Sequence, residues 1–239
     1  MSEEALMRNI LQERPNRRLV GRLAESASFV EDVNIKDKTV LDIGCGYGWC
    51  EMNLLDRGVG RIVGLDVTEK DLETARKHVQ DDRATWKTGS ATALPFEDES
   101  FDTVVCWEVI EHIPKHSEPR MFAEVRRVLK EGGRFFLSTP YDSTLSRWLD
   151  PAWMLIGHRH YSSAELMRLG LESDMGATRV ATKGGVWSLL ATLAMYISKW
   201  VLRRQTVFAQ FFERRQGARV RAGRRHRDDL RRIREGYVM

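Results

Sequence analysis

The chain has 239 residues, of which 42% are hydrophobic and 30% are charged, and its formal net charge is +4. With 18 glycines, 6 prolines and 3 cysteines, it has the composition of a globular protein. This composition excludes collagen, long disordered tracts and a small domain held together by disulfides. The first 13 residues show no basic stretch followed by an apolar one, so we expect a cytoplasmic protein with reduced thiols.

The charge is distributed unevenly along the chain. Residues 199–239 contain 13 Lys and Arg against 4 Asp and Glu, whereas the other 198 residues contain 25 against 30. The body is therefore acidic and the C-terminal segment is basic. A polyanionic partner, such as a phospholipid surface or RNA, would be attracted to the C-terminal segment rather than to the body.

Apolar runs alternate with amphipathic stretches over most of the chain. Residues 3–30 have apolar positions at helical spacing, and Pro15 separates two expected short helices. Strands are expected at 39–43, 61–66, 84–87, 101–107 and 133–138, and helices at 50–57, 69–79 and 118–129. This alternation predicts an α/β fold, with a mostly parallel sheet and helices on both faces. A ligand would then bind beyond the carboxyl ends of the strands.

The strand expected at 39–43 runs directly into three glycines, Gly44, Gly46 and Gly48. Glycines at such a turn let the backbone bend sharply and approach a ligand with no Cβ in the way. The spacing differs from the dinucleotide-binding fingerprint, and a tight turn without a ligand is the alternative interpretation. Asp66 ends the next strand, where an acid can accept hydrogen bonds from ribose hydroxyls.

Four segments in this order resemble the class I S-adenosylmethionine-dependent methyltransferases, and among them the group related to quinone-biosynthesis methyltransferases. They are residues 40–48 (VLDIGCGYG), 88–96 (TGSATALPF), 101–114 (FDTVVCWEVIEHIP) and 132–140 (GGRFFLSTP). The resemblance covers about residues 38–170 and implies a Rossmann-like fold with a seven-stranded, mostly parallel sheet. We divide the chain into an N-terminal helical cover (1–37), a methyltransferase domain (38–183) and an amphipathic, basic C-terminal segment (184–239). Arg17, Arg18 and Arg22 of the cover are expected on a solvated helix face.

The resemblance implies that S-adenosylmethionine is the cofactor. It places the turn from Gly44 to Gly46 under the methionine part, and Asp66 and Val67 at the ribose and adenine. Ser90 stands where an aspartate is common in the adenine-side loop, and its hydroxyl could hydrogen-bond the adenine amino group. The residues expected to bind the cofactor are Asp42, Gly44, Cys45, Gly46, Asp66, Val67, Ser90, Ala91 and Trp107.

Methyl transfer is an in-line displacement that depends mainly on holding donor and acceptor together in a desolvated site. A hydroxyl acceptor also needs a group that takes its proton. The catalytic candidates are His112, after the fourth strand, and His160, in the run HRHY at 158–161. A capping or core role for His112, and a solvated loop around His158 and His160, are the structural alternatives.

Glu108, Glu111 and His112 have a spacing that would place them on one face of a helical turn. Two carboxylates and an imidazole suit Mg²⁺ or Mn²⁺. The run resembles the metal-binding stretch of catechol-type quinone O-methyltransferases and small-RNA 2′-O-methyltransferases, with His160 as a fourth ligand. Similar runs occur in metal-free members of the broad family. We therefore assign no metal ligands and keep Mg²⁺ as the alternative.

The C-terminal segment carries an apolar face over residues 186–212. Its uncharged run, 184–198, has 15 residues, fewer than the roughly 20 needed to span a bilayer. The helix could lie in a membrane interface with its arginines at the headgroups, or it could pack on the sheet.

We expect an enzyme that methylates oxygen or carbon of a small or lipophilic acceptor, quinol-like or lipid-linked, with a peripheral membrane contact through the C-terminal segment. RNA ribose 2′-O-methylation with a divalent metal is the enzymatic alternative, and the acidic body argues against it. A non-catalytic S-adenosylmethionine-binding module is the alternative from another class.

Overall fold

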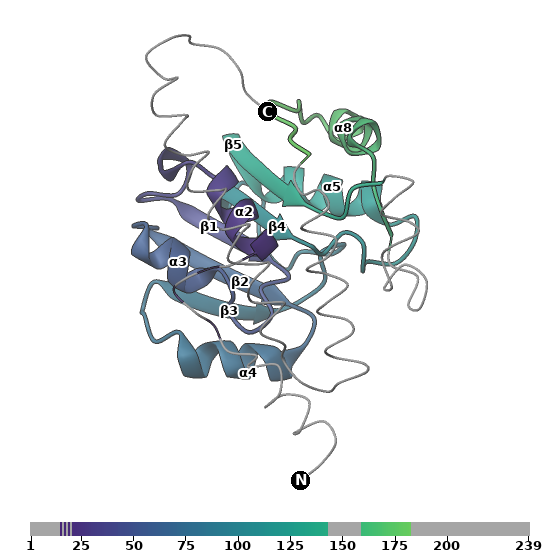
Figure 1. Cartoon of the computed structure of the whole chain (residues 1–239). Helices are drawn as coiled ribbons and strands as arrows, with labels where there is room; N and C mark the ends of the chain where they lie inside the picture. Colours follow the sequence, from purple (N-terminus) through teal and green to yellow (C-terminus); the bar gives the residue numbers. More distant parts are fainter. Residues whose placement is uncertain (1–14, 16, 18, 20, 143–158, 183–239) are drawn as a thin grey trace.

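A parallel sheet forms the centre of the computed structural model, which describes residues 15, 17, 19, 21–142 and 159–182. Its strand order is β3-β2-β1-β4-β5, and all neighbouring strands pair in parallel (Figure 1). The strands are β1 (Thr39–Ile43), β2 (Arg61–Asp66), β3 (Ala84–Thr88), β4 (Phe101–Trp107) and β5 (Leu129–Ser138). The predicted α/β class is confirmed. The described ranges contain five of the seven predicted strands, and the other two stay a prediction.

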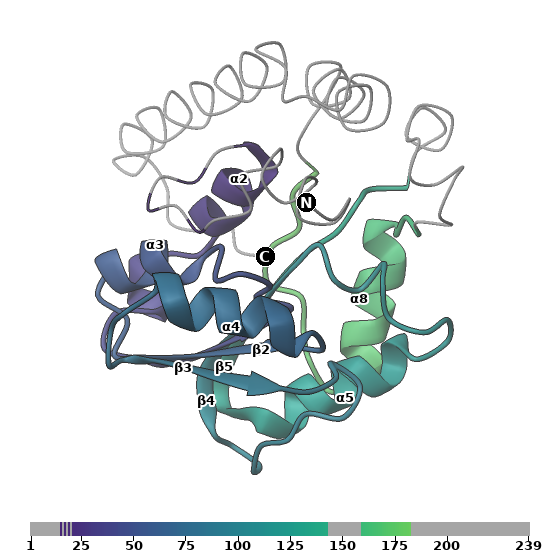
Figure 2. The ribbon, with the colours of Figure 1, turned by 90° about the horizontal axis from the view of Figure 1, so that it is seen from below.

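Helices cover both faces of the sheet, as predicted. On one side lie α2 (Gly21–Phe29), α3 (Glu51–Asp56) and α4 (Glu69–His78); on the other lie α5 (Glu118–Val128) and α8 (Ser163–Glu172) (Figure 2). A short 3-10 helix, η1 (Asp32–Asn34), precedes β1. Most predicted bounds agree to within one or two residues, but β5 begins four residues earlier than expected. The first of the two predicted N-terminal helices and the C-terminal segment lie outside the described residues.

Alternating residues of each strand build the two halves of the core. Leu41 and Ile43 of β1 belong to the apolar cluster that α5 covers, whereas Val40 belongs to the cluster on the side of α3. All three side chains are fully buried. Apolar residues on both faces are typical of a parallel sheet between two helical layers. No helix in the described ranges combines the length and the apolar character needed to cross a membrane.

The strand order reverses at β1. The chain passes from β1 to β2 and β3 on one side, and then crosses to β4 on the other side of β1. Ile43 pairs with Leu65 of β2 and with Cys106 of β4, so the three carboxyl ends are in register. Such a reversal of strand order is the place where open α/β sheets bind ligands.

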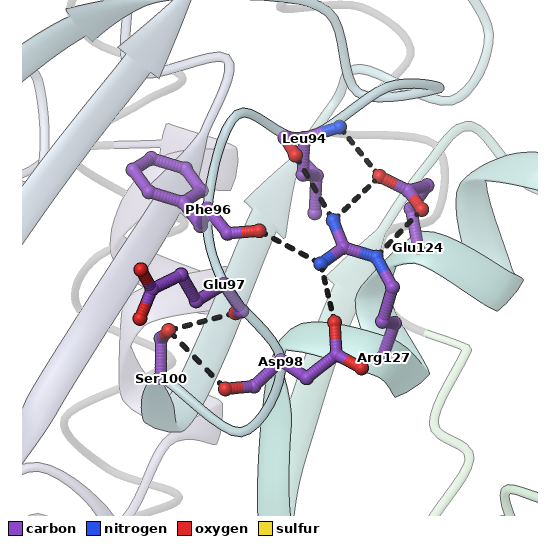
Figure 3. A network of polar contacts seen from close by, with 7 residues as sticks. All are labelled: Leu94, Phe96, Glu97, Asp98, Ser100, Glu124 and Arg127. Carbon is purple, nitrogen blue, oxygen red and sulfur yellow. Dashed lines mark hydrogen bonds and ion pairs between the residues drawn. The ribbon is translucent and has the colours of Figure 1, made fainter.

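A polar network fastens the loop after β3 to α5 (Figure 3). Arg127 donates from Nη1 to the carbonyl oxygen of Phe96 at 2.7 Å and from Nη2 to that of Leu94 at 3.0 Å. The same guanidinium pairs with Glu124 and Asp98, and Glu124 accepts the Leu94 N–H at 2.7 Å. The loop contains the segment expected beside adenine, so α5 fixes the path of that segment.

We predict that Arg127→Ala lowers the free energy of unfolding by about 1–3 kcal/mol, because it leaves part-buried carbonyl groups without a donor. Arg126→Ala, on the exposed face of the same helix, is the matched control and should change stability by less than about 0.5 kcal/mol. Urea denaturation followed by circular dichroism measures both. Equal stability of the two variants would contradict the role given to Arg127.

Candidate functional site

The turn after β1 lies at the carboxyl ends of the strands, where the strand order reverses. Gly44 and Gly46 have φ angles of +75° and +53°, a region in which side chains are strained. A Cβ on Gly44 would lie 2.2 Å from Cγ2 of Val109, in the loop after β4. The turn after β1 and the loop after β4 therefore meet where the strand order reverses, and only glycine permits this approach.

Asp66 ties the glycine turn to the end of β2. Its Oδ2 accepts the Gly46 N–H at 2.9 Å, and its Oδ1 accepts the Thr68 N–H at 2.9 Å. Each carboxylate oxygen has two lone pairs, so the carboxylate can still accept hydrogen bonds from hydroxyls of a ligand. The neighbouring Val67 is 71% exposed, which leaves an apolar surface beside this carboxylate.

The other residues predicted to bind the cofactor differ in accessibility. The Ser90 hydroxyl is used locally, because its Oγ lies 3.0 Å from Thr92 Oγ1 and accepts the Thr92 N–H at 3.2 Å. Ala91, Cys45 and Trp107 have buried side chains. Cys45 can therefore line the turn mainly with its backbone.

Three acidic side chains surround the glycine turn: Asp42 in β1, Glu51 at the start of α3 and Asp66 at the end of β2. Glu51 is completely buried, and among the described residues no side chain donates a hydrogen bond to either of its carboxylate oxygens. Burial raises the pKa of Glu51 to about 8; the backbone N–H groups of Glu51 and Cys50 oppose this shift, and the Asp66 charge adds to it. Burial and the Glu51 and Asp66 charges also raise the pKa of Asp42 well above its usual range.

Glu51 was not among the site residues predicted from the sequence. The available signal was its spacing of three and four residues from Leu54 and Leu55, which places all three on one helix face. In the structure these three residues are the buried residues of α3. A charged residue on an otherwise apolar inward face is the pattern that marks it.

The loop after β4 carries two further acids. Glu108 has a φ of +57°; its Oε1 accepts the Ser138 hydroxyl at 2.9 Å, and its Oε2 lies 3.1 Å from Arg22 Nη1. Glu111 is buried and accepts the Thr139 hydroxyl at 3.0 Å. Burial and the Glu108 charge raise the pKa of Glu111 to about 8. Arg22 of α2 therefore contacts the loop after β4 while its side chain stays exposed, as expected for a solvated helix face.

The predicted helical turn over residues 108–112 is not formed, and the alternative of a metal site loses its geometric basis. Glu108 is left-handed, and residues 110–112 form a turn in which the His112 N–H donates to the Val109 carbonyl oxygen at 2.8 Å. Across the described part of the chain, no group of three His, Cys, Asp or Glu side chains is arranged to hold a metal ion. Binding of Mg²⁺ by Glu108, Glu111, His112 and His160 has no support there.

His112 and His160 lie on segments that the structure joins. Arg159 donates from Nη2 to the Ile110 carbonyl oxygen at 2.8 Å and from Nε to that of Glu111 at 3.3 Å. The Tyr161 hydroxyl also donates to the Ile110 carbonyl oxygen, at 3.1 Å. The turn that carries His112 is thus held beside the segment that carries His160. His158 lies outside the described residues, and the catalytic roles stay a prediction.

The residues at this edge fit S-adenosylmethionine. Gly44 and Gly46 present backbone where a Cβ would obstruct, and Asp66 offers acceptors suited to ribose hydroxyls. Glu51 and Asp42 are buried acids next to the turn, and a ligand that carries positive charge would favour their ionised forms.

Comparison with known proteins identifies the region that builds this edge. Residues 40–133 match a family model described as a methyltransferase domain. The chain is 35% identical over 157 residues to a malonyl-[acyl-carrier protein] O-methyltransferase of Erwinia pyrifoliae, covering 66% of this chain and 53% of that protein. It is 40% identical over 103 residues to a ubiquinone/menaquinone biosynthesis C-methyltransferase of Paracoccus denitrificans, covering 41% and 40%. The matched part thus spans about half or less of these relatives.

A solved structure has a similar fold. An S-adenosylmethionine-dependent methyltransferase from Mesorhizobium loti is 20% identical, with a TM-score of 0.53 over 62% of this chain and 78% of that one. The match to the family model begins in β1 and ends in β5, so it includes the glycine turn, Asp66 and the loop after β4. Residues 40–133 therefore form a methyltransferase domain, and its fold is the one found in S-adenosylmethionine-dependent methyltransferases.

Proposed function

We propose that the protein transfers the methyl group of S-adenosylmethionine to oxygen or carbon of a small or lipophilic acceptor, quinol-like or lipid-linked. The observation that carries this proposal is the glycine turn that Asp66 holds at the point where the strand order reverses. The acceptor class is supported by the names of the relatives, one a quinone-biosynthesis C-methyltransferase, and by the apolar face of the C-terminal segment.

The task of the chain in this reaction is to hold two reactants in line. The cofactor supplies a methyl group on a positively charged sulfur when it is bound. Gly44 and Gly46 let the backbone approach it, Asp66 accepts its hydroxyls, and Arg127 steadies the loop beside it. Positioning of this kind can provide much of the rate enhancement without a covalent intermediate.

The acceptor is proposed to bind beyond β4 and β5. The exposed His112 would take the proton of a hydroxyl acceptor, and Glu111 beside it is a buried acid. Glu108 and Glu111 hold the hydroxyls of Ser138 and Thr139, which fixes the chain on both sides of this space. A carbon acceptor would need the same positioning and a base only where a proton leaves.

The first test concerns the cofactor. We expect Asp66→Ala to weaken binding of S-adenosylmethionine and S-adenosylhomocysteine by about 10- to 100-fold, because hydrogen bonds to a charged group are each worth about 1.5–3 kcal/mol. Isothermal titration calorimetry measures both ligands. Asp82→Ala, at an exposed acid after α4, should leave both affinities unchanged. Unchanged binding in the Asp66 variant would remove this carboxylate from the site.

The second test separates an enzyme from a binding module. With tritiated methyl donor and a panel of quinols, polyprenyl phenols and malonyl-acyl carrier protein, we expect His112→Ala to lower transfer by about 10²- to 10⁴-fold. Its affinity for the cofactor should stay within about threefold of the wild type, because the imidazole is not expected to touch the cofactor. His116→Asn, in the same loop, is the control. Cofactor binding without transfer to any acceptor would favour the non-catalytic module.

RNA is kept as an outcome of the same assay. Transfer to RNA that falls steeply with added salt would overturn the proposed acceptor class, since phosphate contacts release counterions. Transfer to a neutral quinol should respond little to salt.

The C-terminal segment is proposed to contact a membrane surface. Deletion of residues 204–239 removes most of the Lys and Arg residues of the C-terminal segment. It should abolish flotation with phosphatidylglycerol vesicles, because each basic residue near an anionic surface contributes about 1 kcal/mol to the binding free energy. Phosphatidylcholine vesicles are the control. Flotation that persists in the truncated protein would exclude a membrane role for these residues.

A further inference from the structure

Glu51, the buried acid at the start of α3, has no role in the methyl transfer proposed above. We propose that Glu51 is a positioning residue of the cofactor site. It holds a proton in the free protein and releases that proton to solvent when the cationic cofactor binds, so that the site favours S-adenosylmethionine over its demethylated product. This inference rests on the proposed function, because it needs that cofactor at the glycine turn.

The groups that face Glu51 are acids and thiols. Asp42 faces it from β1 and Asp66 from β2, and the thiols of Cys45 and Cys50 lie within the same electrostatic environment. Among the described residues, no Lys, Arg or His forms an ion pair with Glu51 or Asp42.

The cation nearest in sequence, Arg57 at the other end of α3, has partners of its own. It donates from Nη1 to the Ala27 carbonyl oxygen at 2.9 Å and from Nε to Asp32 at 2.8 Å. These contacts hold its guanidinium against the segment before β1. Within the described part of the chain, Arg57 therefore forms no ion pair with Glu51.

This arrangement dictates the protonation state of the free site. Burying an ionised carboxylate without a cationic partner costs free energy, so a buried carboxyl group tends to keep its proton. The Asp66 carboxylate accepts hydrogen bonds from two backbone N–H groups. A negative charge on Asp66 disfavours ionisation of Glu51 and Asp42. Glu51 and Asp42 then titrate as an interacting pair rather than as independent groups.

Cofactor binding changes this balance. S-adenosylmethionine brings a sulfonium and an ammonium, whereas the demethylated product has lost the sulfonium charge. A positive charge near a buried acid favours its ionised form, and the effect is strong where water is excluded. Ionisation of Glu51 therefore stabilises the methyl donor more than the product, and the product is the ligand that leaves more easily.

The main experiment compares the full chain with Glu51→Gln, which copies the shape of the neutral acid. Dissociation constants for S-adenosylmethionine and S-adenosylhomocysteine are measured by calorimetry between pH 6.5 and 9. In the wild type we expect the preference for S-adenosylmethionine, relative to the variant, to rise by about tenfold over this range, since one pKa unit of differential interaction is a factor of ten. Both proteins meet the same ligands, so titration of the ligands themselves cancels.

Glu73→Gln, an exposed acid on α4, is the matched control and should follow the wild type. A Glu51→Gln variant with the pH profile of the wild type overturns the inference and leaves the proposed function standing. Absence of binding by the wild type at every pH overturns the proposed function, and the inference with it.

A second measurement does not depend on the variant binding its ligand. Burial raises the pKa of Glu51 to about 8 from its ordinary value of 4.5, so between these pH values the folded state holds a proton that the unfolded state loses. The stability that this proton contributes is complete below the lower value and is lost as pH rises through about 8. The melting temperature of Glu51→Gln, taken relative to the wild type, should therefore increase between pH 5 and 8. A constant difference would overturn the proposed protonation.

If Glu51→Gln does not fold, the inference can be tested on the wild-type protein alone. Calorimetry at pH 7 in two buffers of different ionisation enthalpy counts the protons released on binding. We expect more protons to be released with S-adenosylmethionine than with S-adenosylhomocysteine, and equal numbers overturn the inference.

Discussion

The close approach between the glycine turn and the loop after β4 is the constraint on which the rest of the site depends. Val109 occupies the space that a Cβ on Gly44 would need, and Asp66 holds the Gly46 N–H from the end of β2. Loops from three adjacent strands are thereby fixed to one another without a ligand. The edge is organised in advance, so binding need not order it.

The two sides of this edge differ in how their acids are compensated. Near the glycine turn, no described side chain donates to the Glu51 carboxylate, and burial raises the pKa values of both Glu51 and Asp42. Beyond β4, Glu108 contacts Ser138 and Arg22, and Glu111 contacts Thr139. One side therefore has a deficit of positive charge, which suits a cationic donor. The other has partners from several elements, which suits the positioning of an acceptor.

Local sequence patterns predicted the elements well where each apolar run ends at a clear turn. The strands over 39–43, 61–66 and 101–107 agree with the structure to the residue. The fifth strand was expected from residue 133, but β5 begins at Leu129, which pairs with Phe101; the register then shifts before Arg134 pairs with Thr103. A contact between residues distant in sequence leaves no local signal, so this extension could not be read from the pattern.

The same limit explains which parts of the site were predictable. The glycine turn and Asp66 are encoded within short segments, and the structure brings them together as expected. The left-handed Glu108 is held by Ser138 and Arg22, from β5 and α2, and those contacts replace the helical turn that its spacing suggested. Glu51 could have been noticed from its helical phase, but its lack of a partner becomes visible only in three dimensions.

The proposed acceptor side includes residues outside the part of the chain that matches the methyltransferase family model. The matched region, 40–133, contains the glycine turn, Asp66 and Glu108. The two partners of Glu108 lie outside the matched region: Arg22 precedes it and Ser138 follows it. Arg159, which holds the turn that carries His112, lies still further along the chain. Segments that vary around a common cofactor domain can therefore reshape the acceptor side while the donor side stays the same, as expected where function resides in sites added to a shared fold.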